Sequence, residues 1–192
     1  MAQYRQLEVV ILLTAALFGG CARAPAAGTD AVRGGVSLTA INAQAARLGG
    51  SVPRDLERVR AATASFHDIA AAQAAGYPTA VPPCLDSLPI GAMGHHYVDR
   101  RIVDEKVDVE HPEILLYAPR PGGRQKLVAV EYIIPYRIRP REETPPRIFD
   151  QEMKRQDALN LWYLHVWAWE ENRAGLFADW NPAVTCPAKP GS

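Results

Sequence analysis

The chain has 192 residues, of which 48% are hydrophobic and 22% are charged, and these values are ordinary for a globular protein. Its 21 basic and 21 acidic residues cancel, so it lacks the basic footprint of nucleic-acid-binding proteins and the polybasic patch of membrane-surface proteins. The sequence contains no glycine-rich phosphate-binding or dinucleotide-binding motif and no H-E-x-x-H metalloprotease motif.

An apolar run at residues 9–18 follows a short polar start and ends at Gly19, Gly20 and Cys21. This layout is typical of a secretory signal peptide, and the run is shorter than the roughly 20 apolar residues that cross a bilayer. A buried core helix is the alternative interpretation. We expect residues 1–20 to be a signal peptide and the protein to be exported to the cell envelope.

Two cleavage sites compete at the end of this run. Residues 17–21 (LFGGC) resemble a bacterial lipobox, in which Cys21 is lipidated and acyl chains hold the protein on a membrane facing the periplasm. The other candidate is an A-x-A-like site for ordinary signal peptidase at residues 22–24. We favour the lipobox, and the small and polar residues 21–36 then form a flexible tether.

Cys84 and Cys186 are the cysteines that remain if Cys21 is lipidated. Export would place them in an oxidising compartment, where paired thiols usually form a disulfide. We therefore predict a Cys84–Cys186 bond, which would stabilise the fold by roughly 4–5 kcal/mol in the chain-entropy model. A metal role for this pair is disfavoured, because C-x-x-C spacing is absent.

Apolar residues recur at helical spacing in the first half of the chain. The pattern predicts a short helix over residues 37–48 and a longer one over residues 53–75, which Gly76 would cap. Residues 81–89 are rich in proline and are expected to be a loop.

The second half of the chain shows the period of β-strands. We expect extended segments at 93–98, 113–118, 127–134 and 161–169, the middle two forming a hairpin. Residues 148–158 are ambiguous and allow a short helix. Helices followed by antiparallel strands predict one α+β domain over residues 37–192, with N-terminal helices packed on a small antiparallel sheet.

Three of the predicted strands each have a face on which one polar residue lies among apolar neighbours, namely His96, Glu131 and His165, with His95 on the opposite face from His96. An unpaired buried carboxylate is costly, so Glu131 needs a partner, a metal ion or solvent. If the three strands are neighbours, two imidazoles and one carboxylate can converge on Zn²⁺ or non-haem Fe²⁺. In an enzyme, this set would favour hydrolytic or oxidative metal chemistry.

Two further interpretations stay open. The same residues can form a purely structural hydrogen-bond network in a non-catalytic envelope protein, or a metal-free catalytic or ligand site. Tyr97, Tyr163 and Asp179 are candidate second-layer partners of the group. All four tryptophans follow residue 160, where they pack the core or line a pocket for a small molecule.

Several separated strings resemble, in order, those of a group of exported bacterial proteins of unknown function, many of them labelled lipoproteins. The strings are residues 71–77 (AAQAAGY), 91–98 (GAMGHHYV), 112–117 (PEILLY), 127–132 (LVAVEY) and 165–169 (HVWAW), within a resemblance that covers roughly residues 55–187. The resemblance implies that His96, Glu131, His165 and the two late cysteines belong to recurring strings of the group. It points to His96 rather than His95 as the histidine of interest, and it implies no activity.

Overall fold

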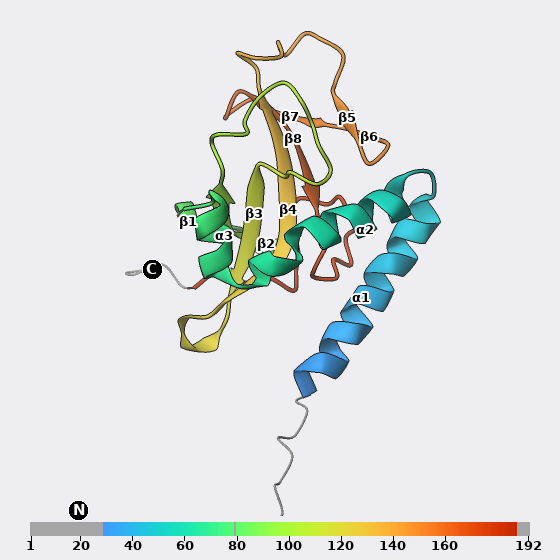
Figure 1. The fold of residues 1–192 in the computed structure, drawn as a ribbon, viewed down its shortest axis with the longest axis vertical. Helices are drawn as coiled ribbons and strands as arrows, with labels where there is room; N and C mark the ends of the chain where they lie inside the picture. Colours follow the sequence, from blue (N-terminus) through green and yellow to red (C-terminus); the bar gives the residue numbers. More distant parts are fainter. Residues whose placement is uncertain (1–28, 79, 188–192) are drawn as a thin grey trace, which may run out of the picture.

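The computed structural model of the protein describes residues 29–78 and 80–187. Three N-terminal helices pack on one face of a six-stranded antiparallel sheet (Figure 1), which confirms the predicted α+β architecture. The predicted signal peptide, Cys21 and the first part of the predicted tether lie outside the described residues. Within the described part of the chain, no helix is long and apolar enough to span a membrane.

The helical layer begins earlier than predicted and is divided once more. Residues 29–36, expected to be part of the tether, are helical. The helices are α1 (Thr29–Leu48), α2 (Val52–Thr63), the 3₁₀ turn η1 (Ala64–His67) and α3 (Ile69–Ala75). The helix predicted over residues 53–75 is therefore two helices with a turn between them.

Asp68 is the reason for this break. Its backbone is extended, and its carboxylate accepts a hydrogen bond from the Ala70 amide at 2.9 Å, so Asp68 acts as the N-cap of α3. The Tyr117 hydroxyl, which comes from the sheet, donates to the Phe66 carbonyl at 2.6 Å and holds the break in place. Gly76 ends α3 with a φ of 121°, as its predicted role as C-cap requires.

The large sheet has the strand order β1-β2-β3-β4-β8-β7, and all neighbouring strands are antiparallel. Its strands are β1 (Ala80–Ser87), β2 (Gly91–Val98), β3 (Ile114–Pro119), β4 (Gln125–Pro135), β7 (Lys154–Gln156) and β8 (Leu161–Val166). The turn η2 (Pro121–Gly123) joins β3 to β4, which confirms the predicted hairpin.

Two segments differ from the sequence prediction because their residues were compatible with more than one structure. Residues 81–89, expected to be a loop, contribute most of β1, an edge strand whose register breaks between Val81 and Leu85. Proline is tolerated at such an edge because fewer amides are needed for pairing. Residues 148–158 form no helix but the small hairpin β5 (Arg147–Ile148) and β6 (Gln151–Glu152), followed by β7.

Strand β8 ends at Val166, three residues before the predicted end. The Ala168 amide donates to the Val166 carbonyl at 2.8 Å, and the chain turns there. Trp167 then packs on the face of the sheet away from the helices, whereas Trp169 packs on the helical side against His67. The unbroken strand predicted over residues 161–169 would have placed both tryptophans on one face, and the turn after Val166 is the reason that it does not.

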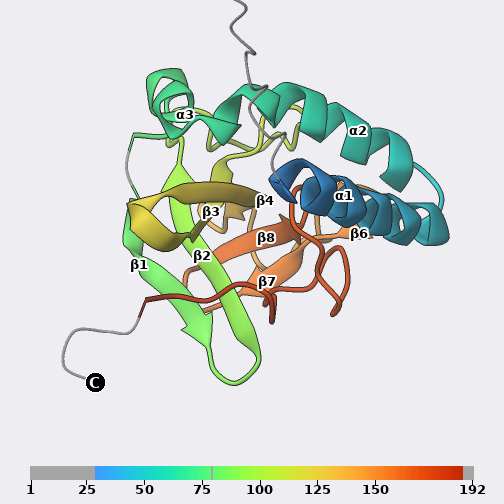
Figure 2. The same ribbon diagram turned by 90° about the horizontal axis from the view of Figure 1, so that it is seen from below.

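The sheet lies between the helices and the C-terminal segment (Figure 2). An apolar cluster of side chains lies on each of its faces. The helices cover one face, where Leu115, Val130 and Tyr132 are buried among residues of α1 and α2. The C-terminal segment runs along the other face, where Leu116 and Val184 are buried. The disulfide between Cys84 and Cys186 is present, as predicted, and ties this segment to β1.

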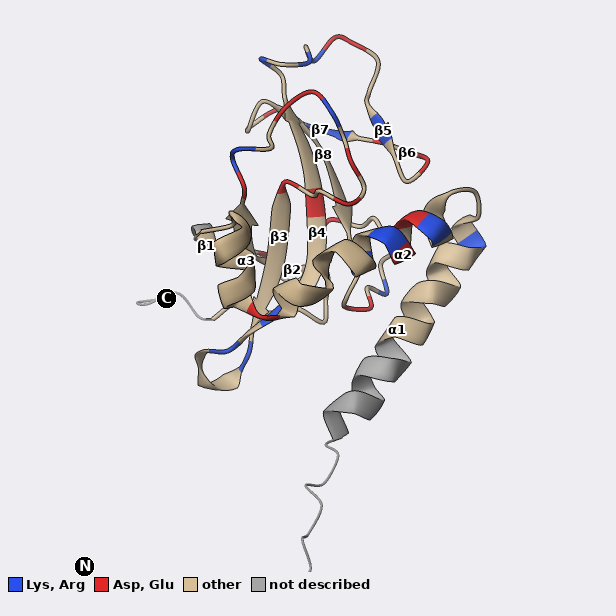
Figure 3. Ribbon diagram, in the orientation of Figure 1, with Lys and Arg blue, Asp and Glu red and all other residues tan. Residues whose placement is uncertain are grey.

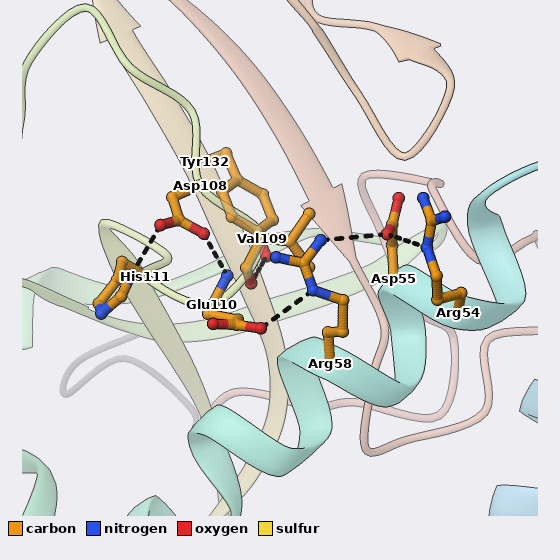
Figure 4. Close-up of polar contacts among 8 residues, drawn as sticks. All are labelled: Arg54, Asp55, Arg58, Asp108, Val109, Glu110, His111 and Tyr132. Atoms are coloured by element: carbon orange, nitrogen blue, oxygen red, sulfur yellow. Dashed lines mark hydrogen bonds and ion pairs between the residues drawn. The ribbon is translucent and has the colours of Figure 1, made fainter.

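Charged residues gather on α2 and on the loops, and the middle of the sheet carries few of them (Figure 3). Figure 4 shows how one such loop is held on the helical face. Arg58 of α2 pairs with Glu110 at 3.0 Å, Asp108 with His111 at 3.0 Å, and the Tyr132 hydroxyl donates to the Val109 carbonyl at 2.7 Å. Because Tyr132 follows Glu131 on β4, this anchor also fixes the backbone at the acidic position.

Candidate metal centre

His96 lies on β2, Glu131 on β4 and His165 on β8. Glu131 and His165 are direct cross-strand partners, while β3 separates β4 from β2. One ligand atom from each of the three residues lies within 4.8 Å of the other two. The structure therefore brings together the three side chains that the sequence singled out.

The three groups face one another without forming hydrogen bonds. The Nε2 atom of His96 is 3.6 Å from a carboxylate oxygen of Glu131, which exceeds hydrogen-bonding range. The ring centroids of His96 and His165 are 6.0 Å apart at 66°. Trp167 stacks on His165 with an interplanar angle of 12° and a centroid distance of 5.9 Å, so it fixes the plane of that imidazole.

All three side chains are buried, and His165 is 0% exposed. Among the described residues, no hydrogen-bond partner is found for either ring nitrogen of His165 or for Nδ1 of His96. Buried polar atoms are normally paired, and a neutral imidazole offers one donor and one acceptor. The unsatisfied atoms of this group are thus donor atoms of the kind that bind transition metals.

Burial keeps both histidines in the neutral form that coordinates metal ions. It lowers the pKa of His96 to about 4, against a weaker polar contact with the Gly94 backbone that favours the protonated ring. Burial also lowers the pKa of His165 well below its ordinary value, and the positive charges of His96 and Lys154 would add to that effect. At neutral pH the two imidazoles therefore need no deprotonation before they bind a cation.

Burial has the opposite effect on the acid of the group. It raises the pKa of Glu131 to about 8, and the carboxylates of Asp179 and Glu113 add to the rise, while Lys154 opposes it. A divalent cation beside Glu131 would reverse this shift, because a positive charge stabilises the carboxylate.

Two of the three predicted second-layer partners lie on this side of the sheet. The Tyr163 hydroxyl donates to one carboxylate oxygen of Asp179 at 3.2 Å, and the Lys154 ammonium donates to the other at 2.5 Å. Neither Tyr163 nor Asp179 hydrogen-bonds the three central side chains. Asp179 instead acts on Glu131 through its charge.

Tyr97 lies elsewhere. It is the residue next to His96, so its side chain points to the helical face of β2. There it is buried in the helix-side core, with its ring centroid 5.0 Å from that of Tyr117. The sheet thus separates Tyr97 from the candidate metal centre.

Sequence reasoning missed two charged residues that act on the centre. Glu113, directly before β3, is 2% exposed, and its carboxylate accepts the Ile133 amide at 3.1 Å. An acid next to the apolar run of β3 was the available signal. Lys154 escaped notice because its segment was not predicted to be a strand.

No protein-family model, curated protein or solved structure matches the chain. The geometry and chemistry of the site therefore carry the functional inference.

Proposed function

We propose that this protein is an exported metal-binding protein in which His96, Glu131 and His165 hold one divalent transition-metal ion. The observation that carries the proposal is the state of His165. Its two ring nitrogens are buried without partners, and they lie beside a second imidazole and a carboxylate.

The donor set favours Zn²⁺ or Fe²⁺. Two histidines and one carboxylate bind catalytic zinc with a fourth position left for water, and they also form the facial triad of non-haem iron proteins. Two neutral imidazoles and one carboxylate leave a divalent ion with a net charge of about +1, which favours a further anionic or polar ligand. A metal ion held in this way would supply hydrolytic or oxidative chemistry to a substrate that reaches the open position.

A purely structural network is less well supported. Such a network stabilises a fold through hydrogen bonds between its members, and His96 and Glu131 are too far apart for one. A structural role would also not explain the two unpaired nitrogens of His165, since a buried apolar side chain at this position would make the fold more stable.

We infer that the protein reaches the cell envelope and is held on a membrane by lipid on Cys21. The LFGGC string supports lipidation, and the Cys84–Cys186 bond supports an oxidising compartment outside the cytoplasm. The resemblance to exported bacterial proteins of unknown function, many of them labelled lipoproteins, adds to this inference. Mass spectrometry of the mature protein should find an acylated N-terminal Cys21, and an unmodified N-terminus near residue 25 would contradict it.

The test of metal binding is the metal content of the mature protein, purified untagged from the envelope without chelator. We expect about one Zn or Fe per chain in the wild type and a loss of about 10-fold or more in the His96→Ala/His165→Ala variant. His95→Ala is the matched control, because His95 is adjacent in the chain but outside the metal-ligand group. A wild type that lacks metal, or a double variant that retains it while folded by circular dichroism, would overturn the proposal.

A further inference from the structure

Residues 177–186, here called the C-terminal strap, cross the sheet on the face that carries the candidate metal centre. In Figure 2 the C-terminal segment runs along the side of the sheet opposite the helices and passes β2 and β1. The strap has no regular secondary structure apart from one bridge at Asn181, so its position depends on individual contacts.

One end of the strap is attached to β7 and β8 by polar contacts. The Lys154 ammonium donates to the Phe177 carbonyl at 2.8 Å and to the Asp179 carboxylate at 2.5 Å. Tyr163 of β8 donates to the same carboxylate at 3.2 Å. This end therefore lies beside the strand that carries His165.

The strap also positions Trp167, the aromatic residue beside His165. The Trp167 indole donates to the Ala178 carbonyl at 2.6 Å, and the same ring stacks on His165. Val184, 1% exposed, packs in the apolar cluster that contains Leu116, Ala129 and Trp167. The strap thus positions the ring that stacks on His165.

The other end of the strap is attached to β2 and β1. Asn181 and Ala92 exchange two backbone hydrogen bonds of 3.0 and 3.1 Å. Gly91 permits this approach, because a Cβ atom there would collide with the Asn181 backbone. Beyond the bridge, the Cys84–Cys186 bond is the one covalent attachment of the strap to the sheet among the described residues.

We propose that the C-terminal strap is a cover over the metal centre that the Cys84–Cys186 disulfide locks shut. With the bond intact, the strap is fixed at both ends and a bound ion exchanges slowly. When the bond is reduced, the last part of the strap detaches from β1, and the centre exchanges its metal faster through local opening. This inference rests on the proposed metal-binding function.

The unlocking step needs a reductant, and a dithiol of the thioredoxin class would supply it. One thiolate attacks a sulfur of the Cys84–Cys186 bond and forms a mixed disulfide, which the second thiolate resolves. Two electrons and two protons pass to the protein, so that Cys84 and Cys186 become thiols and the reductant becomes a disulfide. Oxidation by a dithiol oxidase in the same compartment would restore the lock.

The first test measures the rate at which metal passes from loaded protein to an excess of chelator. We expect the Cys84→Ser/Cys186→Ser variant to release metal roughly 10-fold faster or more than the oxidised wild type, since locking removes the largest opening of the strap. Serine avoids new thiols that could bind the ion. Val59→Ala is the matched control, because Val59 is buried on α2 in the helix-side core, on the face of the sheet opposite the metal centre; it should release metal at the wild-type rate.

Asn181→Ala is a second variant that tests the strap, for the case that the double serine variant does not fold. The buried Asn181 side chain donates to the Glu171 carbonyl and accepts the Ala183 amide, so its loss loosens the strap while the disulfide stays intact. We expect faster metal release than from Val59→Ala. Equal release rates for oxidised wild type, Asn181→Ala and reduced wild type would overturn the strap proposal while leaving the metal site intact.

A second readout does not depend on metal. Diethyl pyrocarbonate acylates neutral imidazoles that the reagent can reach, and mass spectrometry locates the product. In metal-free protein, His165 should be acylated slowly when the disulfide is intact and at least about tenfold faster after reduction by a phosphine, while exposed His111 reacts equally in both. Equal rates at His165 would refute the cover. If the wild type lacks metal but His165 shows this difference, only the metal-binding function fails.

Discussion

At the scale of single residues, the candidate centre is a set of side chains that oppose folding in the absence of a ligand. Glu131 is buried and accepts no hydrogen bond from any described residue, and its pKa rises to about 8. His165 buries two unsatisfied ring nitrogens beside it. Residues that destabilise a fold in this way are expected where a ligand compensates, which is why the metal ion is the simplest explanation for all three.

Replacement of Glu131 by glutamine should separate metal binding from folding. Glu131→Gln removes the anionic ligand, so we expect metal content to fall about 10-fold or more. The metal-free variant should be at least as stable as metal-free wild type, and about 1–3 kcal/mol more stable above pH 8, where the wild-type carboxylate ionises in a buried position. Urea denaturation at pH 9 measures this difference; a variant that is much less stable would indicate that Glu131 supports the fold instead.

Glu113 makes the stability of the metal-free protein depend on pH. Burial raises its pKa from 4.5 to about 8, so between these values the folded state holds a proton that the unfolded state has lost. The free energy of unfolding therefore falls as pH rises through this window. Glu113→Gln keeps an acceptor for the Ile133 amide but has no carboxyl group to titrate, so the free energy of unfolding should fall less steeply with pH in the variant. Relative to the wild type, the variant should therefore be about 1–4 kcal/mol more stable at pH 9 than it is at pH 5. Urea denaturation of both proteins at pH 5, 7 and 9 measures this difference. The same difference in stability between variant and wild type at all three pH values would contradict the expectation.

At the scale of secondary-structure elements, the centre depends on the exact pairing of β2, β3, β4 and β8. A shift of one residue in β2, β4 or β8 would turn its polar side chain to the opposite face, and β3 sets the position of β2 relative to β4. Gly94 protects the register of β2 next to His96. It has a φ of 100°, and a Cβ atom there would lie 2.6 Å from the Tyr117 carbonyl oxygen of β3.

Gly94→Ala should therefore disturb the centre without changing a ligand. We expect a loss of about 2–4 kcal/mol in the free energy of unfolding, from the strained backbone and the collision with β3, together with weaker metal binding. Gly122→Asn is the control, since Gly122 also has a positive φ but has open space around it, and asparagine tolerates this conformation. Chemical denaturation and metal titration of both variants test the expectation, which fails if the two variants behave alike.

The elements that the sequence predicted correctly are those with a strong local pattern. The apolar runs of β3 and β4 and their Gly-containing turn predicted the hairpin, and the single polar residues on β2, β4 and β8 predicted the candidate ligands. Predictions failed where a single local hydrogen bond interrupts a regular pattern: Asp68 caps a new helix, and β8 ends where Ala168 turns back on Val166. The strap could not be predicted, because its position depends on scattered contacts that leave no periodic signal.

At the scale of the whole molecule, one face of the sheet is stabilised by helices and the other by the strap, its disulfide and, in our proposal, a metal ion. The helix-side core contains most of the buried apolar residues, whereas the opposite layer is smaller and includes the polar centre. Ligands that bind only the folded state stabilise it by mass action.

Metal ions should raise the thermal stability of the whole domain. At a free metal concentration 100 times the Kd, the expected gain is about 2.7 kcal/mol. Differential scanning calorimetry should show a higher Tm for the loaded wild type, a return to the metal-free Tm after chelation, and no metal-dependent change for His96→Ala/His165→Ala. A similar rise in Tm for the double variant would place the ion at another site.

The most direct measurement of the central claim is anomalous diffraction at the metal absorption edge, from crystals of protein purified without chelator. We predict one strong anomalous peak on the face of the sheet away from the helices, about 2.0–2.2 Å from a ring nitrogen of His96, a ring nitrogen of His165 and a carboxylate oxygen of Glu131. The absence of a peak beside these three residues, or a peak only at another part of the molecule, would contradict the account.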